Sequence, residues 1–240
     1  MLQQHKTFSM NKMVIFFMVA FMSLFAACGN GNKADNKNAD NKQSPANTTK
    51  TTPPTTATKI ILFFGNSLTA GYGVDPTQAF PALIQQKIDS LNLPYKVING
   101  GVSGETTAGG NQRIDFVLKQ QPINVFVLEL GANDGLRGIP LTETRKNLQS
   151  IIDKVKAKYP HTKLVLAGMQ LPPNMGQSYA TQFKNIYPDL AKKNNMTLIP
   201  FLLAGVGGEA RLNQQDGLHP TAEGYQIVAE NVWKELKGVL

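Results

Sequence analysis

The sequence is poor in the residues that build disulfide scaffolds and zinc sites. Its 240 residues include one cysteine and three histidines. A single cysteine cannot close a disulfide within the chain, and a structural zinc site takes four ligands drawn mostly from these two residue types. We therefore exclude a disulfide-stabilised scaffold and expect no metal site.

Acidic residues are outnumbered by basic ones, but the excess is small in the part that can fold. The whole chain has a formal net charge of +8. Half of this charge comes from Lys6, Lys12 and the lysine-containing polar segment that follows them. Residues 59–240 keep about +4, with no basic stripe interleaved with aromatic residues. The composition therefore gives no indication of nucleic-acid binding.

The sequence also lacks an apolar run of about 20 residues, the length that crosses a membrane. Residues 1–28 instead combine a basic start, an apolar core from Met13 to Phe25, and Ala26-Ala27-Cys28, which is the layout of a secretory signal. The lone cysteine after two alanines resembles the lipobox of bacterial lipoproteins, although Phe25 replaces the usual leucine. We expect Cys28 to be lipidated and to anchor the exported protein in the cell envelope, periplasmic or outer membrane. An ordinary signal peptide cut nearby is the alternative.

Residues 29–58 consist almost wholly of small and polar residues, so they cannot bury enough apolar area to offset the entropy of ordering. We expect a disordered tether that reaches roughly 30 Å. The remaining residues, 59–240, are enough for one domain with a full core and show no internal repeat.

In this domain apolar runs alternate with helical stretches, which predicts an α/β fold: a parallel sheet with helices on both faces. The expected strands are 59–64, 95–98, 123–130, 163–168 and 197–199. The expected helices lie near 78–92, 107–120, 141–158 and 178–195, and a last one follows His219, with Pro220 in its first turn.

A serine stands where the first expected strand ends. The run from Lys59 to Phe64 has the character of a strand covered on both faces, and Gly65 then lets the backbone turn sharply. Ligands bind at the carboxyl ends of strands in open α/β sheets, so Ser67 is placed for chemistry. The alternative is that Ser67 merely caps the following helix, since serine is a preferred N-cap.

Small and polar residues follow the other expected strands as well, in the segments 99–107, 131–135 and 170–174. The carboxyl ends of parallel strands share one edge of the sheet, so these segments are expected to form a site together. Their glycines match neither the dinucleotide-binding fingerprint nor the Walker loop, and no lysine follows where the Walker loop needs one. Nucleotide binding is therefore disfavoured.

One histidine is a candidate general base. His5 lies in the signal segment and His161 in a polar connection where we expect it to be exposed, which leaves His219. A tight turn at Gly217 can bring the Asp216 carboxylate to the imidazole, where it fixes the tautomer and stabilises the imidazolium. The alternative is that Asp216 caps a helix and His219 is a half-exposed surface residue.

Four separated blocks resemble the SGNH hydrolases, also called the GDSL family. They are Gly65-Asn66-Ser67-Leu68, Gly104, Gly131-Ala132-Asn133-Asp134 and Asp216-Gly217-Leu218-His219-Pro220, in the family's order. The chain is most similar to the branch of acyl-CoA thioesterase I, lysophospholipase L1 and arylesterase, on Ser67 to Gly73, Val102 to Thr107 and Leu171 to Asn174. The resemblance implies the flavodoxin-like SGNH hydrolase fold, a three-layer α/β/α sandwich with a five-stranded parallel sheet.

The resemblance also implies roles for the matched residues: Ser67 as nucleophile, His219 as base, Asp216 as its orienting acid, and Ser67 N–H, Gly104 N–H and the Asn133 amide as oxyanion donors. No metal or organic cofactor is required. Asn66 stands where the family usually has aspartate, which should alter only hydrogen bonding or charge near the nucleophile. The alternative for Asn133 is a plain turn residue, a role that asparagine fills well.

We expect a serine esterase or thioesterase that hydrolyses aryl esters, acyl-CoA thioesters or lysophospholipids through an acyl-enzyme intermediate, acting as a monomer on a small-molecule substrate. Apolar residues in the site loops favour a groove for acyl chains: Leu136, Ile139, Leu171, Pro172 and Pro173. Two alternatives remain: a carbohydrate O-acetylesterase of the cell envelope on the same fold, and a binding or structural lipoprotein that has lost activity.

Overall fold

The structure, a computed structural model, describes residues 58–240. The predicted signal segment 1–28 with Cys28, and the predicted tether as far as residue 57, lie outside the described residues. Within the described range, none of the helices combines the length and the apolar character that a membrane crossing requires.

A five-stranded parallel sheet forms the middle of the domain, as the alternating apolar runs predict. The strands lie in the order β2-β1-β3-β4-β5, and each neighbouring pair is parallel. Their bounds are β1 (Lys59–Gly65), β2 (Tyr95–Gly101), β3 (Val125–Glu129), β4 (Lys163–Ala167) and β5 (Thr197–Ile199).

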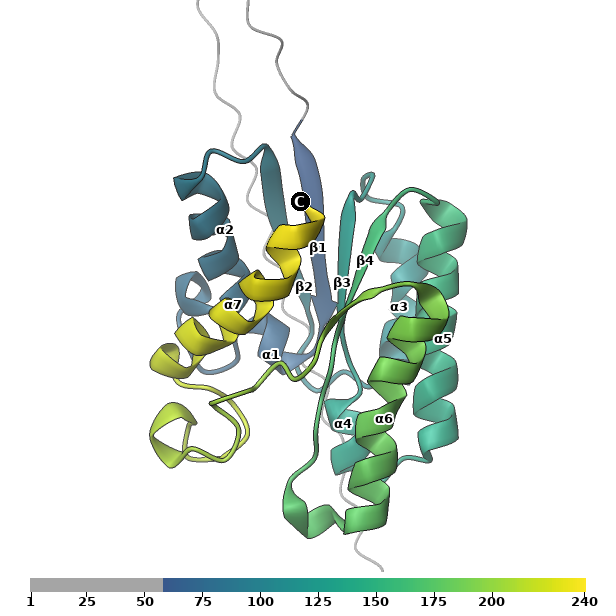
Figure 1. The fold of residues 1–240 in the computed structure, drawn as a ribbon, viewed down its shortest axis with the longest axis vertical. Helices are drawn as coiled ribbons and strands as arrows, with labels where there is room; N and C mark the ends of the chain where they lie inside the picture. The colour runs from purple at the N-terminus through teal and green to yellow at the C-terminus, as the bar shows by residue number, and fades with distance from the viewer. Residues whose placement is uncertain (1–57) are drawn as a thin grey trace, which may run out of the picture. The chain divides into compact units, whose positions relative to one another are not determined.

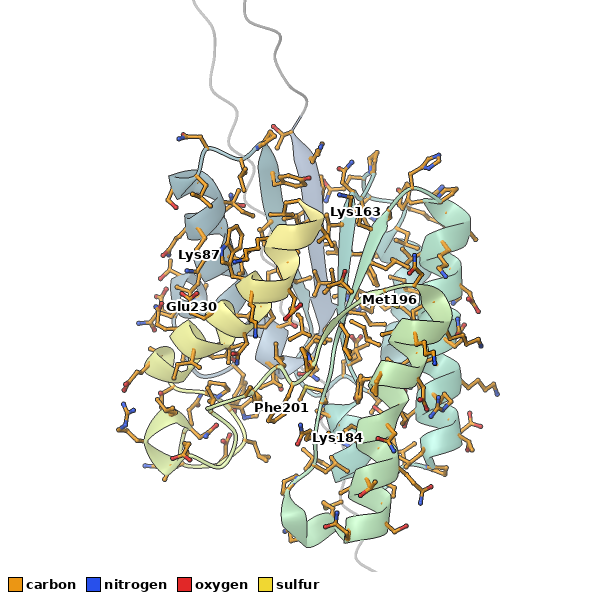
Figure 2. The ribbon with its side chains drawn as sticks, in the orientation of Figure 1. Lys87, Lys163, Lys184, Met196, Phe201 and Glu230 are labelled. Atoms are coloured by element: carbon orange, nitrogen blue, oxygen red, sulfur yellow. The ribbon has the colours of Figure 1, made fainter. Side chains whose placement is uncertain are left out.

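Helices cover both faces of this sheet (Figure 1). On one face α2 (Phe80–Ser90) packs beside α7 (Ala222–Leu236), and on the other lie α3 (Thr107–Val117), α5 (Leu141–Lys158) and α6 (Gln177–Asn194). Figure 2 shows Lys87 of α2 beside Glu230 of α7, and their side chains form an ion pair of 2.6 Å. The predicted α/β/α architecture is therefore confirmed.

β1 is the strand on which the site is built. Its residues Ile61, Leu62, Phe63 and Phe64 are all buried, so both faces of the strand lie in the core. The chain crosses from β1 to β2 and then back past β1 to β3, so the direction of winding reverses between β1 and β3. Ligands of open α/β sheets bind in the crevice outside the carboxyl ends of the strands at such a point.

Two strands differ in length from the prediction. β2 continues to Gly101 instead of ending at residue 98, because it pairs with β1 as far as Gly65. β3 is Val125–Glu129 and not 123–130. Asn124 comes just before the strand: its backbone N–H donates to the Ile60 carbonyl at 2.9 Å, and its side-chain oxygen accepts from Ile60 N–H at 2.8 Å.

The helix ends also needed correction, because local caps decide them. The helix expected from residue 78 starts at Phe80, since Asp75 caps a separate 3₁₀ turn before it. The one expected to reach residue 120 ends at Val117. Thr221 caps α7, so Pro220 precedes this helix and is not in its first turn. The 3₁₀ turns are η1 (Pro76–Gln78), η2 (Pro173–Met175), η3 (Ala210–Leu212) and η4 (Lys237–Val239).

Two short helices were not predicted: α1 (Ser67–Ala70) directly after β1 and α4 (Ala132–Leu136) after β3. Helical periodicity cannot be recognised in four or five residues, and both segments contain turn-forming residues. Both helices begin at the edge of the sheet where the strand-end segments meet.

Candidate active site

The serine lies at the start of a helix, but it does not cap that helix. Asn66 is the N-cap of α1, and its side-chain oxygen accepts a hydrogen bond of 2.9 Å from Leu68 N–H. The alternative that Ser67 is the cap is therefore wrong, and its hydroxyl is left for another partner. Gly71, in the left-handed conformation, ends the helix one turn later.

Three side chains form a hydrogen-bonded chain at this point. The Ser67 hydroxyl lies 2.8 Å from His219 Nε2, and His219 Nδ1 lies 2.6 Å from an oxygen of Asp216. A carboxylate only accepts, so the imidazole N–H belongs on Nδ1, and Nε2 is free to accept from the serine. Thr221 caps the neighbouring helix, so Asp216 has no capping role there.

The second oxygen of Asp216 is held by the main chain. It accepts from Leu218 N–H at 2.9 Å and from His219 N–H at 3.0 Å. Burial acts to raise the pKa of Asp216, but the hydrogen bonds from the imidazole and from these N–H groups outweigh it and lower the pKa to about 2. The carboxylate is therefore ionised at neutral pH and available to orient the imidazole.

An aromatic ring covers the histidine. The ring of Tyr72 lies 4.8 Å from that of His219, centroid to centroid, and Tyr72 itself is 52% exposed. The Tyr72 carbonyl accepts from the Gln214 side chain at 2.8 Å, which ties the segment after α1 to the segment that carries His219. Sequence reasoning missed this contact, because Tyr72 and His219 are far apart in the chain.

Two of the predicted oxyanion donors, Gly104 and Asn133, lie in the segments that follow β2 and β3. Asn133 is the second residue of α4, so the segment 131–135 is a short helix and not the loop expected. Its side-chain nitrogen donates to the Glu105 carbonyl at 2.9 Å, which fixes the amide and leaves its second N–H available. Gly104 has φ +78°, a conformation that favours glycine.

The reason for glycine at 104 is this conformation rather than lack of space, because a Cβ there would meet only Arg137, at 3.9 Å. Arg137 donates to the Gly104 carbonyl at 3.1 Å and so joins the loop after β2 to the end of α4. Within residues 58–240, neither Ser67 N–H nor Gly104 N–H donates to another group of the protein.

A cleft of about 560 Å³ contains Ser67 and His219 among its lining residues. Segments after all five strands contribute to it, as their common edge predicts. Most of the remaining lining side chains are apolar: Leu68, Tyr72, Leu136, Met169, Leu171, Pro172, Phe201, Leu203 and Leu218. Figure 2 marks Phe201 on the segment that follows β5.

Three of the five residues expected to form the groove line this cleft, namely Leu136, Leu171 and Pro172. Ile139 does not; its carbonyl accepts instead from the Tyr179 hydroxyl at 3.0 Å. The side chain of Pro173 lies outside what the structure describes. The contributions of Met169, Phe201 and Leu203 were missed, because nothing in their sequence neighbourhood marks them as site residues.

Among residues 58–240, the remaining titratable groups do not form a second centre. His161 is exposed, as expected. In the part of the chain that the structure describes, histidine, cysteine, aspartate and glutamate do not gather in threes that could hold a metal ion. The buried carboxylate of Glu129, at the end of β3, lies beneath the serine and was missed entirely.

A doubly wound α/β domain whose strand-end loops join a serine, a histidine and an aspartate has the architecture of a serine hydrolase. The model of the GDSL-like Lipase/Acylhydrolase family matches residues 63–227. The chain belongs to this family of serine ester hydrolases.

Relatives and solved structures agree with this assignment. The chain is 38% identical over 184 residues to "Esterase TesA" of Pseudomonas aeruginosa, covering 77% of this chain and 90% of the relative. It is 35% identical over 181 residues to "Thioesterase 1/protease 1/lysophospholipase L1" of Escherichia coli K12, covering 75% and 85%. A crystal structure of TesA, 38% identical, has a TM-score of 0.73 and covers 76% of this chain and 100% of its own.

Proposed function

We propose that this protein hydrolyses acyl esters and thioesters with Ser67 as nucleophile, His219 as general base and Asp216 as the acid that orients the base. The observation that carries the proposal is the hydrogen-bonded chain in the cleft, with Ser67 Oγ 2.8 Å from His219 Nε2 and His219 Nδ1 2.6 Å from Asp216. The relatives named an esterase and a thioesterase support the reaction class.

The reaction proceeds in two halves. Ser67 Oγ attacks the carbonyl carbon while its proton passes to His219 Nε2, and the carbonyl oxygen becomes an oxyanion. Collapse of this intermediate expels the alkoxide or thiolate, which takes the proton from His219 and leaves an acyl-enzyme. Water then repeats the sequence and releases the carboxylic acid. Asp216 holds the imidazole in the tautomer that accepts the first proton.

The oxyanion needs donors that already point to it. Ser67 N–H and Gly104 N–H have no acceptor within the described residues, and Asn133 has one amide hydrogen left beside its bond to Glu105. We assign these three groups to the oxyanion.

The cleft favours acyl chains over acetylated carbohydrates. Its lining is mostly apolar, with side chains such as Leu136, Leu171 and Phe201, whereas a sugar would need several polar partners. We therefore propose a substrate with an acyl chain longer than acetyl.

Turnover of p-nitrophenyl esters and of acyl-CoAs of increasing chain length tests this proposal. We expect kcat/KM to rise from acetyl to longer acyl groups, because each methylene buried in the cleft stabilises the bound substrate by about 0.8 kcal/mol. Activity confined to acetylated sugars would contradict the acyl-chain assignment and favour the carbohydrate O-acetylesterase.

We also propose the N-terminal organisation that the sequence predicts: a signal segment through Cys28, a tether, and a catalytic domain from residue 59. Cys28 is expected to carry lipid in the native host, and a shortened chain that begins at Thr58 is expected to be soluble with unchanged kcat/KM, because every proposed site residue lies after it. Mass spectrometry of the N-terminal peptide checks the first expectation. An unmodified Cys28 would contradict it.

A further inference from the structure

A carboxylate lies in the core directly beneath the serine. Glu129 is the last residue of β3, pairs with Gly65 of β1 in the sheet, and is 1% exposed. A buried carboxylate is costly unless hydrogen bonds satisfy it. The groups that satisfy Glu129 therefore show what holds it there.

The side-chain and N–H donors that reach Glu129 come from the turn that carries Ser67. Asn66 donates twice, from its side-chain nitrogen to Oε1 at 2.8 Å and from its backbone N–H to Oε2 at 3.1 Å. The Thr69 hydroxyl donates to Oε2 at 2.8 Å. These donors lie on either side of Ser67 in the chain, so the carboxylate is hydrogen-bonded to the turn both before and after the serine.

The turn is shaped to admit this carboxylate. A Cβ at Gly65 would stand 2.6 Å from Glu129 Oε2 and would also collide with the Thr69 hydroxyl, so only glycine permits the contact. Both ends of the Asn66 amide are engaged, because its nitrogen donates to Glu129 while its oxygen accepts from Leu68 N–H. The amide is therefore fixed in one orientation.

Burial and the donors of the serine turn act on this carboxylate in opposite directions. Burial raises the pKa of Glu129 to about 7, against the hydrogen bonds from Thr69 and Asn66, which act to lower it. Tyr187 of α6 and Tyr225 of α7 face the same region, and burial, followed by the charge of Glu129, raises the pKa of both. The hydrogen bonds from Asn66 and Thr69 therefore favour the ionised form of Glu129.

We propose that Glu129 is the positioning residue of the nucleophile: by holding Asn66 and Thr69 it fixes the direction of the Ser67 hydroxyl and N–H. The inference rests on the proposed function of Ser67. It assigns to a buried group, outside the lining of the cleft, the task of keeping the nucleophile and one oxyanion donor in place.

An exchange of amide and carboxylate tests the proposal. In Glu129→Gln, the new NH₂ group replaces one of the two carboxylate oxygens. Each of these oxygens accepts from Asn66, one from its side-chain nitrogen and the other from its backbone N–H, so in either orientation of the new amide two donors face each other. In the double variant Asn66→Asp with Glu129→Gln, the Gln nitrogen can donate to the Asp while the Gln oxygen accepts from the backbone N–H of residue 66 and from Thr69. The exchange keeps the charge and restores every hydrogen bond.

We expect Glu129→Gln to lower kcat at least about tenfold, the cost of a buried unsatisfied donor, with KM within about threefold because the cleft lining is untouched. The double variant is expected to return to within about threefold of wild-type kcat, because its hydrogen bonds are restored. Glu230→Gln, the same substitution in the surface pair with Lys87, is the matched control and should leave kcat unchanged.

The rate of fluorophosphonate labelling at Ser67 should follow the same order. A Glu129→Gln enzyme with wild-type kcat, or a double variant no more active than Glu129→Gln, would overturn the inference. If Glu129→Gln does not fold, the test uses Thr69→Val, which removes the hydroxyl that donates to Glu129, and Thr69→Ser, which keeps a hydroxyl. Thr69→Val must lower kcat and Thr69→Ser must keep it near the wild-type value. Equal kcat in the two variants would overturn the inference. Failure to label Ser67 in the wild type would instead refute the proposed function.

Discussion

The Ser67→Ala variant is expected to lose ester hydrolysis almost completely while keeping its fold. Removal of a nucleophilic serine from a triad costs on the order of 10⁶-fold in kcat, and the catalysis that remains comes from the oxyanion donors and binding. The Ser67 hydroxyl bonds to His219 rather than to the core, so its loss leaves the packing of β1 intact. Steady-state hydrolysis of a p-nitrophenyl ester measures the effect.

Ser90→Ala is the matched control, because Ser90 ends α2 with its hydroxyl on the Lys87 carbonyl, far along the chain from the site. It should keep wild-type kcat. Circular dichroism and thermal unfolding must show both variants folded. A folded Ser67→Ala protein that retains more than a few per cent of wild-type kcat/KM would be incompatible with Ser67 as nucleophile.

The Asn133→Asp variant is expected to lose about a hundredfold to a thousandfold in kcat. Aspartate lacks the amide hydrogen that we assign to the oxyanion and places a carboxylate where negative charge develops. The loss corresponds to about 3 to 4 kcal/mol in barrier height. A plain turn residue would tolerate the change, because aspartate serves turns as well as asparagine does. Steady-state kinetics that separate kcat from KM distinguish the two roles.

Asn174→Asp provides the control for an added negative charge. Asn174 is exposed in η2 and does not line the cleft, so this variant should behave like the wild type. The bond from Asn133 to Glu105 is lost in Asn133→Asp, so thermal unfolding is measured alongside. A folded Asn133→Asp enzyme within threefold of wild-type kcat/KM would show that Asn133 is not an oxyanion donor.

Most of the sheet could be predicted from the sequence because β1, β3 and β4 are nearly continuous apolar runs. The run before Gly65 gives β1 to within one residue, and the segments after the strands hold the candidate site because parallel strands end at one edge. Ser67, His219 and Asp216 meet there as the pattern suggested. The buried apolar strands and the long helices were the predictable part.

Contacts between distant segments could not be predicted. Glu129 stands inside the apolar run of β3 and differs from its neighbours only in charge, so nothing local shows that it bonds to Asn66. Asn66, where the family usually has aspartate, was expected to alter only hydrogen bonding or charge near the nucleophile, and its amide is a hydrogen-bond partner of Glu129. The extension of β2 to Gly101 has the same origin, because β1 imposes it through pairing and the residues themselves have no strand preference.

The most direct test of the account is the site of covalent modification by a fluorophosphonate in the wild-type protein. Intact mass followed by peptide mapping is predicted to show one adduct for each chain, located on Ser67, with hydrolysis lost in proportion to labelling. An adduct on a different residue, or complete inactivation with Ser67 unmodified, would contradict the assignment of Ser67 as the nucleophile.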